Sequence, residues 1–163
     1  MIKIIDNVLN DLHFGKLKST LLDNLNSPWY LGKIVDTEKN SPYQFSHTFY
    51  GEQKINSEYF TLLDPILQNL KIKNLIRIKA NLLLKTNEIV KHGFHIDTQS
   101  ENKFNTAIYY LNSNNGYTKF KNGKKVNSVK NRIVIFDGLI EHRGTSCSDQ
   151  PYRGVINFNY LKK

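Results

Sequence analysis

The sequence predicts a mainly β protein with flanking helices, an α+β chain whose strands form a β-sandwich or jelly roll. From residue 75 onward, short runs of β-branched and aromatic residues are broken by Asn and Gly, a pattern typical of a many-stranded antiparallel sheet. Before residue 75, apolar residues recur instead at helical spacing. The 163 residues, without an internal repeat, are the size of one ordinary domain. We therefore expect a single domain, with residues 1–74 as a helical and loop support region and residues 75–163 as the jelly-roll core.

Two amphipathic helices are expected in the support region. Residues 11–25 carry a phenylalanine and leucines at helical spacing, which predicts the first helix. The second should begin after Ser57, a favourable N-cap residue, and continue to Leu70 with a wide apolar face. Pro65 lies inside this second segment and would kink it. Residues 1–5 precede both helices and fit an edge strand.

The remaining segments are expected to be strands and their connections. Residues 27–56 are rich in Asn, Ser, Pro and aromatic residues, which indicates a loop with a short strand at 43–50. Five strands are expected downstream, at residues 75–84, 104–111, 117–121, 132–136 and 152–160. Residues 112–116, Asn-Ser-Asn-Asn-Gly, join two of these strands. Because Asn and Gly accept the positive φ angles of tight hairpins, we interpret this segment as such a turn.

Composition argues against a membrane protein and a disulfide-stabilised protein. No run of the sequence approaches the ~20 apolar residues that a membrane-spanning helix needs. The N-terminal region reaches Asp6 too soon for the long apolar segment of a signal peptide, so we expect a cytoplasmic protein. The single cysteine, Cys147, leaves no partner for an internal disulfide or for a CxxC redox or zinc site.

The basic charge of the chain permits two interpretations. The net charge is +9, and the segment 117–132 contains six basic residues, two interleaved aromatic residues and no acid. The basic residues are Lys119, Lys121, Lys124, Lys125, Lys130 and Arg132, and the aromatic residues are Tyr117 and Phe120. Such a segment could bind nucleic acid through phosphate contacts and base stacking. It could equally be a solvated hairpin in a lysine-rich sequence, which is the more common case.

A histidine and an aspartate two residues apart indicate a metal site. On a strand, His95 and Asp97 would project to the same face, so that an imidazole and a carboxylate converge. These are two of the three ligands of the facial triad of non-haem Fe(II). His142, 45 residues after Asp97 and just past the apolar strand 132–136, is the candidate third ligand. A His-x-Asp motif alone is common by chance, and a solvated His95 is the alternative.

An arginine lies inside the last expected strand, after the third candidate ligand. Arg153 lies eleven residues after His142 in a late strand of the expected core. A buried guanidinium needs a carboxylate partner, and the diacid 2-oxoglutarate would supply one. His92, three residues before His95, has no cysteine partner for a zinc site, and we interpret it as an exposed loop histidine.

Together these residues resemble the catalytic core of the prolyl-hydroxylase-like 2-oxoglutarate- and Fe(II)-dependent oxygenases. The resemblance is closest to small versions encoded by tailed phages and marine bacteria, and it covers residues 75 to 160. It rests on the order of six motifs: His95-x-Asp97, Ala107 to Asn112, Asn115 to Phe120, Asn131 to Phe136, His142-Arg143-Gly144 and Tyr152-Arg153. It implies a double-stranded β-helix, the jelly-roll variant also found in cupins, with residues 75–163 as the catalytic part.

The resemblance also implies specific roles. Fe(II) would be held by His95, Asp97 and His142, and the distal carboxylate of 2-oxoglutarate by Arg153. Further co-substrate contacts would come from Tyr110, Asn157 and Asn81, although the family often has a hydroxyl residue at the second of these positions and a tyrosine at the third.

The implied activity is that of a hydroxylating dioxygenase, an oxidoreductase. With O2, the enzyme would hydroxylate an unidentified small-molecule or peptide substrate and convert 2-oxoglutarate into succinate and CO2. If the chain is phage-encoded, it would act in the host cytoplasm.

Two other functions are compatible with the sequence. A non-catalytic jelly-roll module could bind nucleic acid through the basic segment 117–132, and the absence of succinate formation would distinguish it. A cupin-like metalloprotein could use another metal and no 2-oxoglutarate. Arg153 argues against the second alternative, because such a protein would have no acid for this arginine to bind.

Overall fold

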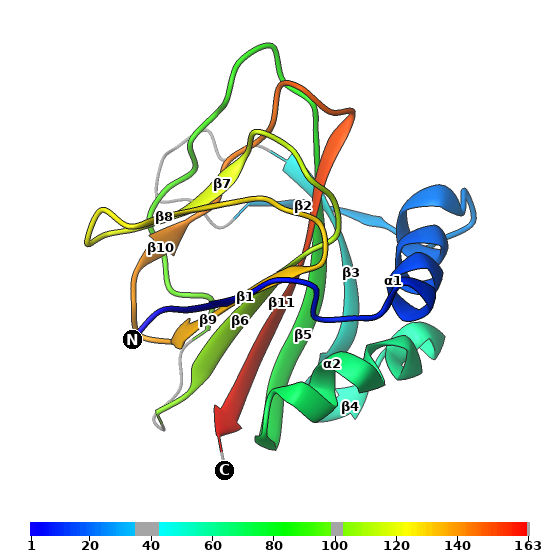
Figure 1. The fold of residues 1–163 in the computed structure, drawn as a ribbon. Helices are drawn as coiled ribbons and strands as arrows, with labels where there is room; N and C mark the ends of the chain where they lie inside the picture. Colours follow the sequence, from blue (N-terminus) through cyan, green and yellow to red (C-terminus); the bar gives the residue numbers. More distant parts are fainter. Residues whose placement is uncertain (35–42, 99–102, 163) are drawn as a thin grey trace.

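The computed structural model describes residues 1–34, 43–98 and 103–162 (Figure 1). Its helical segments are α1 (Asp11–Lys18), the π-helical η1 (Ser19–Asp23), the 3₁₀ segment η2 (Glu58–Leu63) and α2 (Asp64–Asn69). Its strands are β1 (Lys3–Ile5), β2 (Tyr30–Lys33), β3 (Tyr43–Gly51), β4 (Lys54–Ile55), β5 (Ile72–Leu84), β6 (Asn105–Tyr110), β7 (Tyr117–Phe120), β8 (Lys125–Asn127), β9 (Arg132–Asp137), β10 (His142–Arg143) and β11 (Tyr152–Lys162).

The strands form two antiparallel sheets of unequal size. The large sheet has the order β1-β9-β6-β11-β5-β3-β2, with β4 added beside β3. The small sheet has the order β10-β7-β8. The helices lie on one side of the large sheet and the small sheet on the other (Figure 1). This is the arrangement predicted as a jelly roll with flanking helices.

Strict alternation along the large sheet separates two apolar clusters. On β6, Ala107 and Tyr109 pack in the cluster beneath the helices, whereas Ile108 and Tyr110 pack toward the small sheet. Because successive strand residues point to opposite faces, β9 and β11 divide their side chains in the same way. The helices therefore cover one face of the large sheet, and the small sheet covers part of the other.

Local capping explains where the helical segments begin. The side chain of Asn10 accepts a hydrogen bond from the backbone N–H of His13 at 2.9 Å, and α1 with η1 then covers most of the predicted helix. Ser57 accepts from the N–H of Tyr59 at 3.1 Å, as its predicted N-cap role requires. Pro65 occupies the first turn of α2 and produces no kink within a longer helix. None of the helices in the described residues has the length and apolarity needed to cross a membrane.

The structure confirms the five strands predicted downstream, as β5, β6, β7, β9 and β11, and the edge strand at the N-terminus, as β1. The predicted division between residues 74 and 75 falls inside β5, and β1 to β4 from the first part belong to the large sheet. The strand predicted at 43–50 is β3. The loop predicted before it contains β2, while residues 35–42 lie outside the described part of the chain.

The interpretation of residues 112–116 as a tight hairpin turn was wrong. β6 pairs with β9 and β11, and β7 pairs with β8 and β10, so this segment connects the two sheets. None of its residues has a positive φ. Gly116 is required for space instead, because a Cβ there would lie 2.7 Å from Cδ of Arg153 and 2.7 Å from the carbonyl oxygen of Ser146.

Candidate active site

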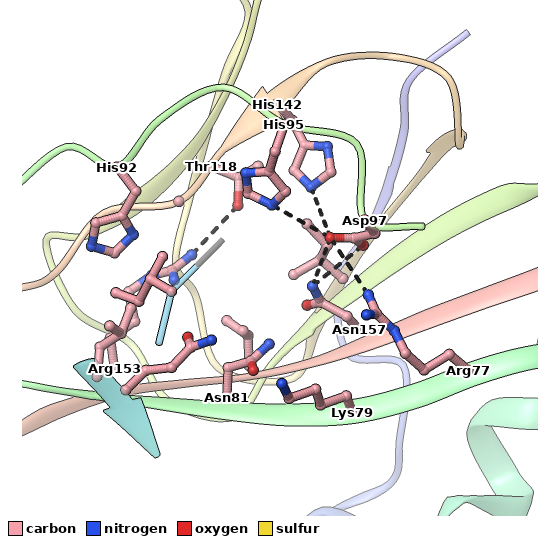
Figure 2. Close-up of a pocket in the computed structure, with 16 residues that line it drawn as sticks. Arg77, Lys79, Asn81, His92, His95, Asp97, Thr118, His142, Arg153 and Asn157 are labelled. Atoms are coloured by element: carbon pink, nitrogen blue, oxygen red, sulfur yellow. Dashed lines mark hydrogen bonds and ion pairs between the residues drawn. The ribbon is translucent and has the colours of Figure 1, made fainter. Parts of the chain in front are cut away.

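Three predicted metal ligands converge at one cavity (Figure 2). One carboxylate oxygen of Asp97, Oδ1, lies 3.5 Å from Nε2 of His95 and 3.6 Å from Nε2 of His142. The candidate ligand atoms of the three residues all lie within 4.8 Å of one another. One divalent ion could therefore contact all three residues.

The backbone that carries this cluster differs from the prediction in one respect. His142 lies on β10, but His95 and Asp97 lie on an extended segment outside the named strands. An isolated antiparallel bridge fixes that segment: the N–H of His95 donates to the carbonyl of His142 at 2.9 Å, and the reverse bond measures 3.1 Å. The bridge supplies the extended geometry that a strand was expected to supply.

Backbone carbonyls determine which nitrogen each imidazole offers to a metal. Nδ1 of His95 lies 3.1 Å from the carbonyl of Gly93, and Nδ1 of His142 lies 3.2 Å from the carbonyl of Ile140. Since a carbonyl oxygen can only accept, each Nδ1 carries a proton. Both Nε2 atoms therefore face Asp97 as potential metal-binding nitrogens.

Electrostatics keep Asp97 ionised. Its side chain is only 4% exposed, and burial by itself would raise its pKa. Hydrogen bonds from His142 and His95, with the nearby charge of Arg77, outweigh burial and hold the pKa of Asp97 far below its ordinary value. Burial likewise opposes protonation of His95, but hydrogen bonds to Asp97 and to the Gly93 carbonyl raise its pKa. Without a metal, His95 and Asp97 share a proton between Nε2 and the carboxylate, and a divalent ion would replace that proton.

Two amides and a guanidinium orient the Asp97 carboxylate. Asn159 donates from Nδ2 to Oδ2 at 3.2 Å, and Asn157 donates to both carboxylate oxygens at 3.4 Å. Nη2 of Arg77 lies 3.9 Å from Oδ1, and Nε of Arg77 donates to Oδ1 of Asn159 at 3.2 Å. The carboxylate is thus fixed by strands β5 and β11 although its own segment is irregular.

Arg77 and Asn159 were not predicted as site residues, although the sequence contains a signal for Arg77. Arg77, Lys79 and Asn81 alternate with the apolar residues Ile78 and Ala80 along one predicted strand. A polar stripe at a period of two in the middle of a sheet indicates a strand face turned toward a functional cavity.

Arg153 lies deep in the same cavity. It is 3% exposed; its Nε donates to Oγ of Ser128 at 2.9 Å, and its Nη2 makes a longer contact of 3.4 Å to Oγ1 of Thr118. Burial lowers the pKa of this guanidinium. Among the described residues no carboxylate lies within ion-pair distance of it. A buried, uncompensated cation therefore faces the cavity, as predicted for a residue that binds a carboxylate.

The cavity joins the triad to Arg153 and is lined by both polar and apolar residues. Asn81 and Asn157 line it, and each has a buried Oδ1 without a hydrogen-bond partner among the described residues, whereas their contacts to a co-substrate stay a prediction. His92 also lines the cavity and is only 5% exposed, so its interpretation as an exposed loop histidine was wrong. The bridge between Lys91 and Thr145 draws this segment against the small-sheet side of the site.

Tyr110 lies behind Arg153 and does not line the cavity in which a co-substrate contact was predicted for it. It is fully buried beneath Arg153, with the guanidinium carbon 5.7 Å from the centre of its ring. Its hydroxyl donates to Oγ1 of Thr118 at 2.8 Å. Thr118 lines the cavity, whereas Tyr110 is not among the lining residues. A direct contact from Tyr110 to a co-substrate stays a prediction. Thr118, which lines the cavity and contacts Arg153, carries the hydroxyl that could contact a co-substrate instead.

The basic segment 117–132 lacks the stacking surface that nucleic-acid binding would use. Both of its aromatic residues, Tyr117 and Phe120, are buried. Lys121 pairs with Glu141, and Arg132 pairs with Asp6 through two hydrogen bonds of 2.5 and 2.9 Å. Strands β7 and β8 of this segment form a hairpin, and phosphate binding by its other basic residues stays a prediction.

Comparisons with known proteins identify the fold. No protein-family model and no curated protein sequence matches the chain. Solved structures do match it over nearly its whole length. A prolyl hydroxylase from Trichoplax adhaerens, in complex with a hypoxia-inducible-factor peptide, has a TM-score of 0.68 and 15% identity over 99% of this chain and 83% of that one.

Two proteins solved with a metal and 2-oxoglutarate are similar to a comparable degree. The epimerase SnoN from nogalamycin biosynthesis, in complex with Fe3+, alpha ketoglutarate (2-oxoglutarate) and nogalamycin RO, gives a TM-score of 0.71 at 10% identity, covering 99% of this chain and 78% of that one. HygX from Streptomyces hygroscopicus, with nickel and 2-oxoglutarate bound, gives 0.64 at 12% identity, covering 99% and 83%. The chain therefore has the prolyl-hydroxylase-like jelly-roll fold that these 2-oxoglutarate-binding proteins share.

Proposed function

We propose that this protein is an Fe(II)- and 2-oxoglutarate-dependent oxygenase that hydroxylates a small-molecule or peptide substrate. One observation carries the proposal: a cluster of two histidines and one carboxylate shares a cavity with a buried arginine that has no acid partner among the described residues. The first group suits a metal and the second suits a carboxylate. The co-substrate 2-oxoglutarate links these two requirements in one molecule.

The donor atoms of the cluster suit Fe(II). The Nδ1 atoms of His95 and His142 donate to carbonyls, so a metal would bind their Nε2 atoms in place of a proton, and Asp97 offers an ionised oxygen. Two imidazoles and a carboxylate are the set typical of non-haem Fe(II) oxygenases. The hydrogen bonds from Asn157 and Asn159 to Asp97 are the outer contacts that fix such a ligand in orientation.

The other end of the cavity suits the distal carboxylate of 2-oxoglutarate. Arg153 would pair with it, and Ser128 and Tyr110 hold that arginine in place from the side and from below. Oγ1 of Thr118 accepts hydrogen bonds from both Tyr110 and Arg153, which leaves its own proton for the carboxylate. A guanidinium and a hydroxyl together would bind the anion by charge-assisted hydrogen bonds.

When bound, iron and 2-oxoglutarate supply the oxidising chemistry, in which O2 is consumed and succinate, CO2 and a hydroxylated product are formed. The residues of this chain position the reactants and limit the access of water. Burial of Asp97 and Arg153 keeps both charges in a low-dielectric environment, where they act strongly on bound ligands. We propose a peptide or a small molecule as substrate because one similar structure is solved with a peptide and another with a small molecule.

Replacement of Arg153 tests the proposal. In Arg153→Ala we expect Fe(II) to bind normally, whereas 2-oxoglutarate affinity should fall about 10- to 100-fold because one charge-assisted pair is lost. Calorimetry under anaerobic conditions measures both, and succinate formation in air reports the reaction. Arg132→Ala is the matched control, since it removes an arginine that pairs with Asp6 outside the cavity. Unchanged 2-oxoglutarate affinity in Arg153→Ala would refute the assignment.

A further inference from the structure

The cavity contains more positive charge than the metal and co-substrate require. Three cationic side chains line it, Arg77, Lys79 and Arg153, against the single carboxylate of Asp97. A divalent metal and a doubly charged 2-oxoglutarate would cancel one another. With the histidines neutral, a net charge of about two positive units would remain in the loaded cavity, in a region where charges are poorly screened. This excess belongs to Arg77 and Lys79, because Arg153 is assigned to the co-substrate.

The position of Lys79 in the sheet turns its side chain into the cavity. β5 is an interior strand, hydrogen-bonded to β11 on one side and β3 on the other. The neighbours of Lys79 in sequence, Ile78 and Ala80, are 0% exposed beneath the helices, so the alternation of the strand turns Lys79 into the cavity. Burial and the adjacent charge of Arg77 lower the pKa of Lys79, and the charge of Asp97 offsets this only in part.

Lys79 has no acid partner in the described part of the chain. None of the ion pairs formed there includes it. Arg77 is engaged in part, through Asn159 and at 3.9 Å from Asp97, and its side chain is 30% exposed at the edge of the cavity. Of the two, Lys79 is therefore the group more available to a ligand.

These two cations lie away from the co-substrate arginine. In the pairing of β5 with β11, Arg153 is opposite Leu83, whereas Asn157 is opposite Lys79. Leu83 and Lys79 are four positions apart, about 13 Å along β5. In Figure 2, Arg153 lies at the left of the cavity and Arg77 at the right, with Asn81 and Lys79 in the row between them, and the three candidate metal ligands lie above this row. A five-carbon diacid held by Arg153 would leave the part of the cavity beside Lys79 and Arg77 for the primary substrate.

Resting on the proposed function, we propose that Lys79, assisted by Arg77, binds an anionic group, a carboxylate or a phosphate, of the primary substrate. The position beside the metal ligands would place an adjoining part of that substrate at the reacting centre. A compact ammonium on a flexible stem suits a terminal anion of either kind. The substrate is accordingly an acidic molecule or an acidic residue of a peptide.

Small-anion binding to the loaded protein tests this inference without knowledge of the substrate. The protein is loaded with Zn(II), a diamagnetic stand-in for iron, and saturated with 2-oxoglutarate. Sodium acetate and inorganic phosphate are then titrated separately at constant ionic strength, and the backbone amide signals of β5 are followed by NMR. Lys79→Gln is compared with Lys73→Gln, which removes an exposed lysine from the same strand.

Saturable binding of at least one anion, weakened about tenfold or more in Lys79→Gln and unchanged in Lys73→Gln, is the expected result. Tighter binding of phosphate would indicate a phosphorylated substrate, and tighter binding of acetate a carboxylated one. No saturable binding, or equal binding in Lys79→Gln, would overturn the inference. So would a Lys79→Gln protein that stays folded but no longer binds 2-oxoglutarate, since Lys79 would then belong to the co-substrate. Failure of the unsubstituted protein to take up metal and 2-oxoglutarate would instead refute the proposed function, and this inference with it.

Discussion

The two faces of the large sheet use the same strands for opposite purposes. On β5, Ile78 and Ala80 are buried against the helices, whereas Arg77, Lys79 and Asn81 face the cavity. Burial of apolar surface on the first face supplies the favourable free energy of folding. The second face carries charges and unsatisfied polar atoms that oppose folding until ligands arrive. Alternate residues along this one strand therefore contribute to stability and to function.

This separation predicts which substitutions harm which property. A truncation on the helical face should cost stability and leave the site intact in the molecules that remain folded. A substitution on the cavity face should remove binding and cost little stability, since its residues are held there by neighbours and not by apolar packing.

The largest effect is expected for Asp97→Asn on the cavity face. The amide keeps the shape of the carboxylate but removes the anionic ligand, so Fe(II) affinity should fall by more than about 100-fold while the protein stays folded. Anaerobic calorimetry with Fe(II) measures the first and circular dichroism the second. Asp23→Asn, which breaks only the exposed pair with Lys18, should bind Fe(II) normally. Retained Fe(II) binding in Asp97→Asn would contradict the triad.

The converse effect is expected for Phe158→Ala on the helical face. Phe158 is completely buried in the cluster beneath the helices, and its truncation should lower the free energy of unfolding by about 3–5 kcal/mol. Denaturant unfolding measures this loss. Fe(II) and 2-oxoglutarate should still bind to the folded fraction. A loss of metal affinity without a loss of stability would show that the two faces are not independent.

A smaller effect should follow from crowding Arg153 from behind. In Gly116→Ala the added Cβ would lie 2.7 Å from Cδ of Arg153 and from the backbone oxygen of Ser146, so the arginine must shift. We expect 2-oxoglutarate affinity to fall about tenfold, with Fe(II) affinity unchanged. Gly15→Ala is the matched control, because a Cβ there meets nothing within 4 Å. Equal effects of the two substitutions on 2-oxoglutarate binding would count against the placement of Arg153.

The smallest effect concerns the pH dependence of the metal-free protein. The pKa of His95 is raised above 6.5 in the folded state, so its contribution to stability is complete below about pH 6.5 and is lost as pH rises through the raised value. The pKa of Asp97 is lowered, so its contribution is present above about pH 4 and is lost as pH falls further. Urea unfolding of the metal-free protein should therefore show a decline in stability above pH 6.5 that Asp97→Asn reduces. An identical decline in both proteins would contradict the coupling of His95 to Asp97.

The residues that could be predicted from the sequence are those whose chemical type is unusual for their setting. His95, Asp97, His142 and Arg153 stand out as ligands or as a cation in a core strand, and the structure brings all four to one cavity. The strands of the second half follow from β-branched and aromatic runs, which local sequence is sufficient to indicate.

The features that were missed depend on strand register. The pairing of β11 with β5 puts Asn159 opposite Arg77, where both side chains approach Asp97, and Thr118 contacts Arg153 from a strand of the other sheet. Gly116 was correctly predicted to lie in a connection between strands, but not for the reason given. It is needed because it leaves space for Arg153, not because it allows a positive φ. Contacts between distant segments of this kind have no local signature in the sequence.

Visible absorption of the anaerobic protein tests the central claim most directly. Fe(II) is added first and 2-oxoglutarate second, with His95→Ala and Arg153→Ala treated in the same way. A metal-to-ligand charge-transfer band that appears only on addition of 2-oxoglutarate, is absent in His95→Ala and needs more 2-oxoglutarate in Arg153→Ala is the predicted result. Fe(II) binding without such a band in the unsubstituted protein would contradict the assignment of this cavity to an oxygenase.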